Sequence, residues 1–204
     1  MMGPFDAIAN EVTLKNSDLE INKEKPKKLK DVLKDSHYKT LHHFTKIGIA
    51  SITSISSFSS KKIIKELIKL EILSNLDCKR IVLTDKGKNI CKSKFKPISM
   101  PSRSKQSIQQ ILMRSELYFT LPEEVRQTWE DQNQLIRLFY DEYPEYKDKI
   151  IEKLGFTTWI DARIKINDKY IGICIKPKSN GHKMLEQKKR IAYEYMNCHD
   201  IYEL

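Results

Sequence analysis

Apolar residues recur every three or four positions through much of the first hundred residues, a spacing that favours helices packed on one face. This pattern predicts one helix at 31–47, ended by Gly48, and a short helix at about 51–58. A third helix is predicted at about 60–73, with Ser59 or Ser60 as its N-cap. The buried face of this third helix is predicted to consist of Ile63, Ile64, Leu67, Ile68, Leu70 and Ile72.

The helical spacing ends after the third helix, and a short hairpin is predicted in its place. Residues 75–78 favour a tight turn, and residues 80–84 favour a strand. Thr84 and Gly87 then predict a capped turn. The order of these elements resembles the winged helix-turn-helix of bacterial regulators over about residues 37–95. The residues that carry the resemblance are Asp77, Arg80 and the string Leu83-Thr84-Asp85-Lys86-Gly87.

A winged helix-turn-helix places one helix in the major groove of DNA and uses its wing on the backbone or the minor groove. The third helix has the required division, with an apolar stripe on one side and lysines on the other. An ordinary amphipathic surface helix has the same division, so that alternative stays open. The resemblance implies that DNA is contacted by Ser59, Ser60, Lys61, Lys62, Lys65, Lys69, Lys79 and Arg80.

The distribution of charge favours a polyanionic partner for the first half. The chain of 204 residues has a formal charge of +10. Residues 1–97 carry 20 basic and 11 acidic side chains, whereas residues 98–204 carry 17 and 16. A basic half beside a nearly neutral half is typical of a nucleic-acid-binding module joined to another domain. A lysine-rich composition produced by AT-rich coding is the alternative explanation.

The composition along the chain predicts an α+β protein of two domains. Residues 1–30 are rich in charge and contain Pro26, which predicts a flexible basic arm. Residues 96–107 contain two prolines and predict a basic linker. The arm and linker delimit a winged helix-turn-helix at 31–95 and a second α+β domain at 108–204.

The second domain begins with helical spacing and then changes to alternation. An Asn167-Asp168 pair between two β-prone runs predicts a hairpin turn. The predicted elements, in order, are helices at 107–119, 122–140 and 146–154, strands at 156–166 and 170–175, a helix at 182–196 and a final strand.

This second order resembles the core of the PD…(D/E)xK nuclease superfamily. Ile160-Asp161 stands at the position of "PD", and Cys174-Ile175-Lys176 stands at the position of "(D/E)xK". Glu116 matches the acid on the preceding helix, and Gln187, with Lys188 or Lys189, matches the polar helix residues that often follow. The resemblance implies that Glu116 and Asp161 would hold Mg²⁺ and that Lys176 would assist an activated water. The sequence departs from the pattern at Cys174, which replaces an acid and is a poor ligand for Mg²⁺.

The layout of both halves resembles the replication-relaxation family of plasmid and phage proteins, which implies a DNA-binding accessory of a mobile element. The leading hypothesis is therefore a sequence-specific double-stranded DNA-binding protein without catalysis or cofactor, acting in transcription, replication or transfer. We expect a homodimer, because paired half-sites are common for such folds. The second domain is expected to dimerise or to bind a protein partner. The alternative is a Mg²⁺-dependent endonuclease targeted by its winged helix, and a third interpretation is a protein-interaction module.

Other features exclude several classes of protein. The four cysteines are widely spaced, so neither a zinc finger nor a CxxC site is expected. No apolar run approaches the roughly 20 residues that a membrane span needs. The first residues lack the pattern of a signal peptide. Together these features predict a cytoplasmic protein that has free thiols and no membrane contact.

Overall fold

The computed structural model describes residues 32–95, 108–147, 158–176 and 181–204. Its contacts divide the chain into Met1–Lys34 and Asp35–Leu204, and the fold below is that of the second unit. The predicted arm, the predicted linker and the predicted helix at 146–154 fall outside the described residues, except for their edges. The predicted α+β class is confirmed, since helices combine with two small sheets.

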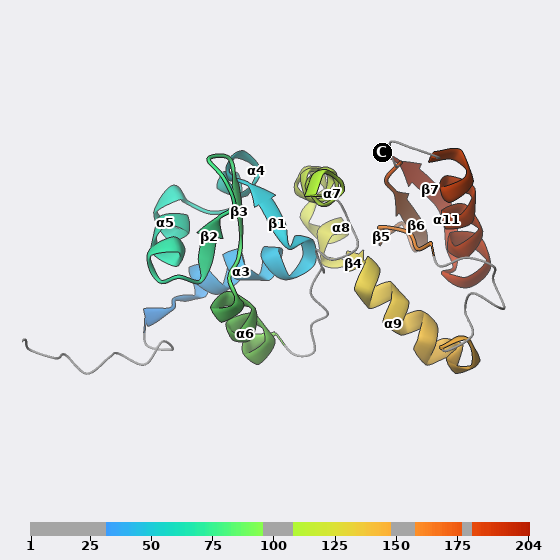
Figure 1. Ribbon diagram of the computed structural model, residues 1–204, viewed down its shortest axis with the longest axis horizontal. Helices are drawn as coiled ribbons and strands as arrows, with labels where there is room; N and C mark the ends of the chain where they lie inside the picture. Colours follow the sequence, from blue (N-terminus) through green and yellow to red (C-terminus); the bar gives the residue numbers. More distant parts are fainter. Residues whose placement is uncertain (1–31, 96–107, 148–157, 177–180) are drawn as a thin grey trace, which may run out of the picture. The chain divides into compact units, whose positions relative to one another are not determined.

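The residues up to Lys94 alternate short helices with a three-stranded antiparallel sheet of order β1-β3-β2 (Figure 1). The predicted end of the first helix is confirmed, because Gly48 follows it with a φ of 75°. The strand formed by Ile49–Ser51 was not predicted. It pairs with Arg80–Val82, and only this long-range pairing makes three residues a strand. The elements are α3 (Asp35–Ile47), β1 (Ile49–Ser51), α4 (Ile52–Ser56), α5 (Lys61–Lys69), β2 (Leu73–Asn75), β3 (Arg80–Leu83) and α6 (Asp85–Lys94).

The turn from β3 into α6 explains the predicted Thr84 and Gly87 cap. The Thr84 hydroxyl accepts a hydrogen bond from Gly87 N at 3.0 Å and donates to backbone oxygens beside β2. A Cβ on Gly87 would lie 2.2 Å from the Ile72 oxygen. Gly87 is therefore required by the close approach of α6 to the chain before β2, and it needs no unusual φ.

The helices that follow differ from the sequence prediction at one place. A single helix was predicted at 122–140, but the structure has two helices separated by a two-residue strand. Thr128 bonds the main chain of Lys165, and Asp131 caps the second helix by accepting from Asn133 N and Gln134 N. These tertiary and capping bonds override the helical spacing. The elements are α7 (Ile108–Thr120), α8 (Glu123–Gln127), β4 (Glu130–Asp131), α9 (Gln132–Glu142) and η1 (Pro144–Tyr146).

A four-stranded mixed sheet of order β4-β5-β6-β7 completes the fold (Figure 1). The predicted hairpin is confirmed, and Asn167 and Asp168 both have positive φ, as a tight hairpin turn requires. The predicted helix before the last strand is also confirmed, and it connects two parallel neighbours. The elements are β5 (Ala162–Ile166), β6 (Lys169–Cys174), α11 (Gly181–Tyr195) and β7 (Cys198–Glu203).

Each sheet has its own buried cluster. Ile111 of α7 packs with Ile49 and Val82 of the first sheet. The larger cluster joins α9, α11 and the second sheet through Phe139, Trp159 and several aliphatic residues. Helix α7 therefore closes the first sheet, although it lies beyond the predicted linker in sequence.

Candidate functional site

Helix α5 presents one polar face to solvent because its other face is anchored. Ser60 caps the helix, with its hydroxyl accepting from Ile63 N at 3.3 Å. Ile64 and Leu67 are buried. The helix ends at Lys69, earlier than predicted, since Glu71 adopts a φ of 58° and the chain enters β2. The apolar residues Leu70 and Ile72 consequently belong to the turn after α5.

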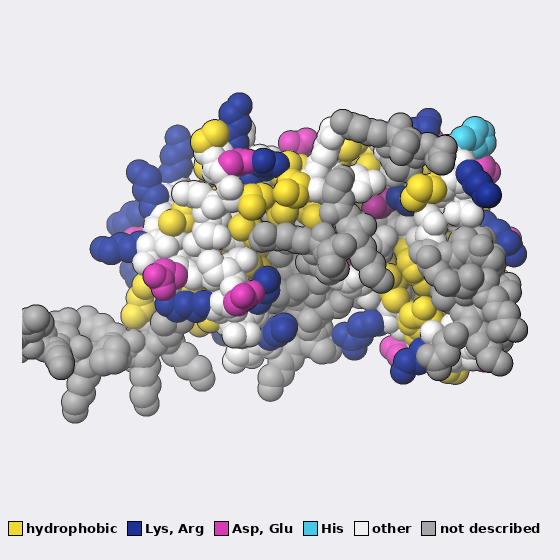
Figure 2. Space-filling model, in the orientation of Figure 1, with side chains coloured by type: hydrophobic (Ala, Val, Ile, Leu, Met, Phe, Trp, Pro, Cys, Tyr) yellow, Lys and Arg dark blue, Asp and Glu magenta, His cyan; other side chains and the backbone are white. Residues whose placement is uncertain are grey.

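The lysines of α5 form an exposed stripe that we call the α5 lysine face. Residues four apart lie on the same side of a helix, so positions 61, 65 and 69 align, with position 62 beside them. All four side chains are exposed, and within the described ranges none makes an ion pair. Figure 2 shows Lys and Arg side chains gathered over α5. The α5 lysine face consists of Lys61, Lys62, Lys65 and Lys69.

Two contacts fix α5 against α3. The His37 ring lies 2.9 Å from the Glu66 carboxylate, with His37 buried. Thr40 and Ser59 share a hydrogen bond of 2.6 Å between their hydroxyls. Ser59 is only 6% exposed. The expectation that Ser59 contacts DNA is therefore corrected, because its side chain faces α3. Ser60 remains exposed at the start of α5.

The turn between β2 and β3 is held by its own acid. The Asp77 carboxylate accepts from Lys79 N at 2.9 Å and is bound by the Arg80 guanidinium. The hydrogen bond from Arg80, together with that from Lys79 N, lowers the pKa of Asp77. Arg80 is thus engaged within the turn, whereas the Lys79 side chain is exposed. Of the two predicted wing contacts, Lys79 has the side chain that is available to a partner.

Asp161, in the "PD" position, is enclosed at the start of the second hairpin. Its carboxylate accepts from Ile175 N at 2.8 Å and is bound by the Lys188 ammonium, which also donates to the Ile175 oxygen at 3.0 Å. The side chains of Lys188 and Asp161 are only 5% and 3% exposed. The Asp161 carboxylate is therefore already paired with a buried cation.

A second buried cation lies beside this pair. Arg114 of α7 is 1% exposed, and its Nη1 donates to the backbone oxygen of Asp161 at 3.3 Å. Burial lowers its pKa, and the charges of Asp161 and Asp131 partly offset that effect. Asp131 is buried, and burial raises its pKa. Asp161, Lys188, Arg114 and Asp131 thus form a buried cluster of charged residues, in which Nε and Nη2 of Arg114 have no hydrogen-bond partner among the described residues.

The other residues of the predicted metal site differ from Asp161 in exposure. Glu116 is exposed, and it follows Arg114 by two positions, which is about half a turn of helix. The side chain of Lys176 is exposed, and its backbone N–H donates to Leu204. Burial raises the pKa of Cys174 to about 12, so its thiol stays protonated. Asp161 is therefore the only one of the three predicted catalytic residues that is buried.

Arg114 had no role in the sequence prediction, and Lys188 was expected only as one alternative, with Lys189, for a polar helix residue and not as the partner of Asp161. Lys188 lies between Leu185 and Ile191, at the spacing of the buried face of α11. Arg114 lies in the same way between the buried residues Ile111 and Tyr118 of α7. In both cases the sequence has a charged residue at a position where the helical spacing predicts a buried side chain, and this pattern could have identified both residues.

The described residues contain neither a cluster of metal ligands nor a membrane-spanning helix. No group of three His, Cys, Asp or Glu side chains gathers there into a possible metal site. No helix in the described ranges combines the length and the apolar character needed to cross a membrane. In comparisons with known proteins, the chain matches no family model, no curated protein and no solved structure.

Proposed function

We propose that residues 35–94 form a winged helix-turn-helix that binds double-stranded DNA through the α5 lysine face. The observation that carries the proposal is that four exposed lysines, without ion-pair partners among the described residues, share one side of a helix whose other side is buried. Cationic side chains of this kind bind phosphates, and helix size suits the major groove.

The order of elements supports the same assignment. Helix, strand, helix, helix and two further strands follow one another, and the first strand joins the edge of the sheet. Helix α4 and helix α5 then correspond to the two helices of the motif, and the Asp77 turn corresponds to the wing. Lys79 is the wing residue proposed to contact phosphate, while Arg80 keeps the turn closed through Asp77.

The test is the salt dependence of binding to a duplex of about 30 base pairs, measured by fluorescence anisotropy. We compare the triple change Lys61→Glu, Lys62→Glu and Lys65→Glu with wild type. Each lost phosphate contact reduces the slope of log K against log salt by about 0.9. The expected slope is therefore shallower by about two to three, together with a large loss of affinity at low salt.

The matched control carries the same change in net charge away from α5. Lys92, Lys169 and Lys183 are exposed and belong to α6, β6 and α11. Their replacement by Glu is expected to leave the slope close to that of wild type. Equal slopes for the α5 variant and wild type, or equal effects of the two triple variants, would exclude the α5 lysine face as the interface.

For the second half, we propose a partner-binding or dimerisation role without catalysis. The reason is that Lys188 pairs with the buried carboxylate of Asp161, whereas the side chains of Glu116 and Lys176 are exposed. The endonuclease alternative is tested with supercoiled plasmid, with and without Mg²⁺ or Mn²⁺. Nicking that requires the divalent ion and disappears in Asp161→Ala would replace our proposal with the endonuclease.

The proposed homodimer has a direct test. Sedimentation equilibrium at micromolar concentration gives the mass of the particle, and 24.0 kDa is the mass of one chain. Twice that mass is expected. A single-chain mass both free and on DNA would remove dimerisation from the proposal.

A further inference from the structure

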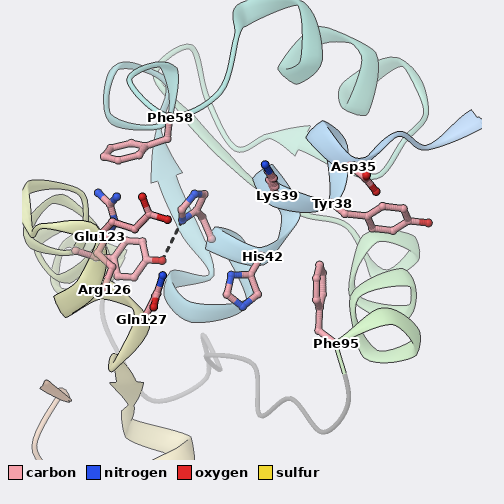
Figure 3. Close-up of a pocket in the computed structure, with 11 residues that line it drawn as sticks. Asp35, Tyr38, Lys39, His42, Phe58, Phe95, Glu123, Arg126 and Gln127 are labelled. Atoms are coloured by element: carbon pink, nitrogen blue, oxygen red, sulfur yellow. Dashed lines mark hydrogen bonds between the residues drawn. The ribbon is translucent and has the colours of Figure 1, made fainter. Parts of the chain in front are cut away.

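A cavity of about 660 Å³ lies against α3, on the side that faces away from α5. Its floor includes Tyr38, Lys39, His42 and His43 of α3, which recur at helical spacing. Figure 3 shows the walls, with Phe95 on one side and Phe58 with the α8 residues on the other. The volume is within the range of cavities that bind small molecules, about 300–1,000 Å³.

Aromatic rings line both ends of this cavity. Phe58 is 36% exposed, and its ring centre lies 5.6 Å from that of His43. At the other end, the rings of His42 and Phe95 are 5.2 Å apart. Phe58 also packs against Phe119, with ring centres 4.9 Å apart, so a planar ring in the cavity would contact the part of Phe58 that its neighbours leave exposed.

One cation in the cavity is held in a fixed orientation. The Arg126 guanidinium carbon lies 4.2 Å above the centre of the Phe58 ring, and Nη1 donates to the Leu121 oxygen at 3.1 Å. Glu123 lines the same cavity one turn earlier on α8, but no ion pair joins it to Arg126 in the described ranges. The stacked guanidinium therefore keeps N–H groups that suit a carboxylate, whose geometry matches the arginine fork.

The polar groups beside Arg126 are consistent with a site for an anion. Burial, followed by the positive charge of Arg126, lowers the pKa of His43 to about 4. His43 is consequently a neutral imidazole near pH 7, and its Nδ1 lies 3.0 Å from the Tyr118 hydroxyl. The charge of Arg126 thus acts on His43. Two acids, Asp35 and Glu123, also line the cavity, and neither forms an ion pair with Arg126 among the described residues. Lys39 adds a second, exposed cation on α3.

We infer that this cavity binds a small planar aromatic carboxylate. Its ring packs against the exposed part of Phe58 and its carboxylate pairs with Arg126, while Lys39 contributes at longer range. The cavity is a ligand site distinct from the α5 lysine face, since the two share no residue. The binding inference does not depend on the proposed DNA interface.

A consequence for regulation follows from α3 and does rest on the proposed function. The helix that forms the cavity floor also holds α5, through the His37–Glu66 contact and the Thr40–Ser59 hydrogen bond. A ligand that binds one arrangement of α3 better than another must shift the position of α5 by linkage. Occupancy of the cavity is therefore expected to change DNA affinity.

The probe is indole-3-acetate, titrated into the full chain by isothermal calorimetry without DNA. We expect saturable binding with a Kd below about 1 mM and clearly weaker binding of tryptamine, which has the same ring but a positive charge. Arg126→Gln is expected to weaken binding at least tenfold, and Phe58→Ala to weaken it severalfold. Circular dichroism confirms that each variant is folded.

Two further variants keep the test decisive. Arg137→Gln removes an exposed arginine of α9 outside the cavity, and its binding is expected to equal that of wild type. Lys39→Gln changes an exposed side chain, so it tests the site even if Arg126→Gln fails to fold. The inference is overturned by the absence of saturable binding at 5 mM probe, about five times the expected limit of Kd. It is also overturned if Arg126→Gln and Lys39→Gln both bind as wild type does, or if tryptamine binds as tightly as indole-3-acetate.

Discussion

Replacement of Lys188 by methionine is the sharpest test of the buried cluster. The change removes the ammonium but keeps most of the aliphatic volume. Asp161, whose side chain is 3% exposed, would then retain the hydrogen bond from Ile175 N and lose its charge partner. The Ile175 oxygen would lose a donor at 3.0 Å.

The expected cost follows from the burial of both groups. Removing one member of a buried ion pair typically destabilises a protein by about 3–5 kcal/mol, because the other charge remains unpaired. The loss of the donor to Ile175 is included in that figure. With a urea m-value of about 2 kcal/mol/M, the unfolding midpoint is expected to fall by about 1.5–2.5 M.

Lys189→Met provides the matched control for this measurement. Lys189 is the next residue of α11, its side chain is 31% exposed, and it pairs with Glu186 and Glu203. An ion pair of this exposure contributes about 1 kcal/mol or less. The double variant Asp161→Asn, Lys188→Met removes both charges and is expected to recover part of the loss. A cost below about 1 kcal/mol for Lys188→Met, or one equal to that of Lys189→Met, would refute the reasoning.

Three further predictions concern the first half. Gly87→Ala is expected to lower the unfolding free energy by about 3 kcal/mol, because its Cβ would meet the Ile72 oxygen at 2.2 Å; Lys86→Ala, one residue earlier, should change it by less than about 0.5 kcal/mol in the same urea titration. Ser60→Ala removes the α5 cap and is expected to cost about 1 kcal/mol and to weaken DNA binding, as anisotropy would show; unchanged stability would contradict that role. The pKa of His43 is about 4 in the folded protein, against an ordinary value of 6.5. As the pH falls, the unfolded chain therefore takes up this proton before the folded protein does. The contribution of neutral His43 to the unfolding free energy is full above pH 6.5, and about 1–3 kcal/mol of it is lost toward pH 4. Urea denaturation at pH 7 and pH 4.5 should show a smaller loss of unfolding free energy for His43→Asn than for wild type. An identical loss in the two proteins would refute the lowered pKa of His43.

Local signals in the sequence determined much of the secondary structure. Gly48 ends α3 with the positive φ that glycine adopts at little steric cost, and Asn167-Asp168 forms the hairpin turn for a related reason. The Ser60 cap and the lysines at four-residue spacing also follow from neighbouring residues alone. These features depend on interactions within a few positions, which is why a pattern in the sequence can predict them.

Long-range contacts decided the features that the sequence left open. Strand β1 exists because Ile49–Ser51 meets β3, about thirty residues later. The break between α8 and α9 depends on Thr128 reaching the main chain of Lys165. Ser59 turned inward because Thr40 lies opposite it. None of these partners is identifiable from local spacing.

The α5 lysine face and the site around Asp161 also differ in how far the sequence could predict them. The α5 lysine face was predictable from the sequence, since solvent exposure of lysines on an amphipathic helix follows from the apolar stripe opposite them. The burial and pairing of Asp161 were not predictable, because its partners are Lys188, 27 positions later, and Arg114, 47 positions earlier. Sequence alone determined which residues carry charge. Tertiary packing decided which charges face solvent and which neutralise one another inside the protein, because burial makes an unpaired charge too costly to keep.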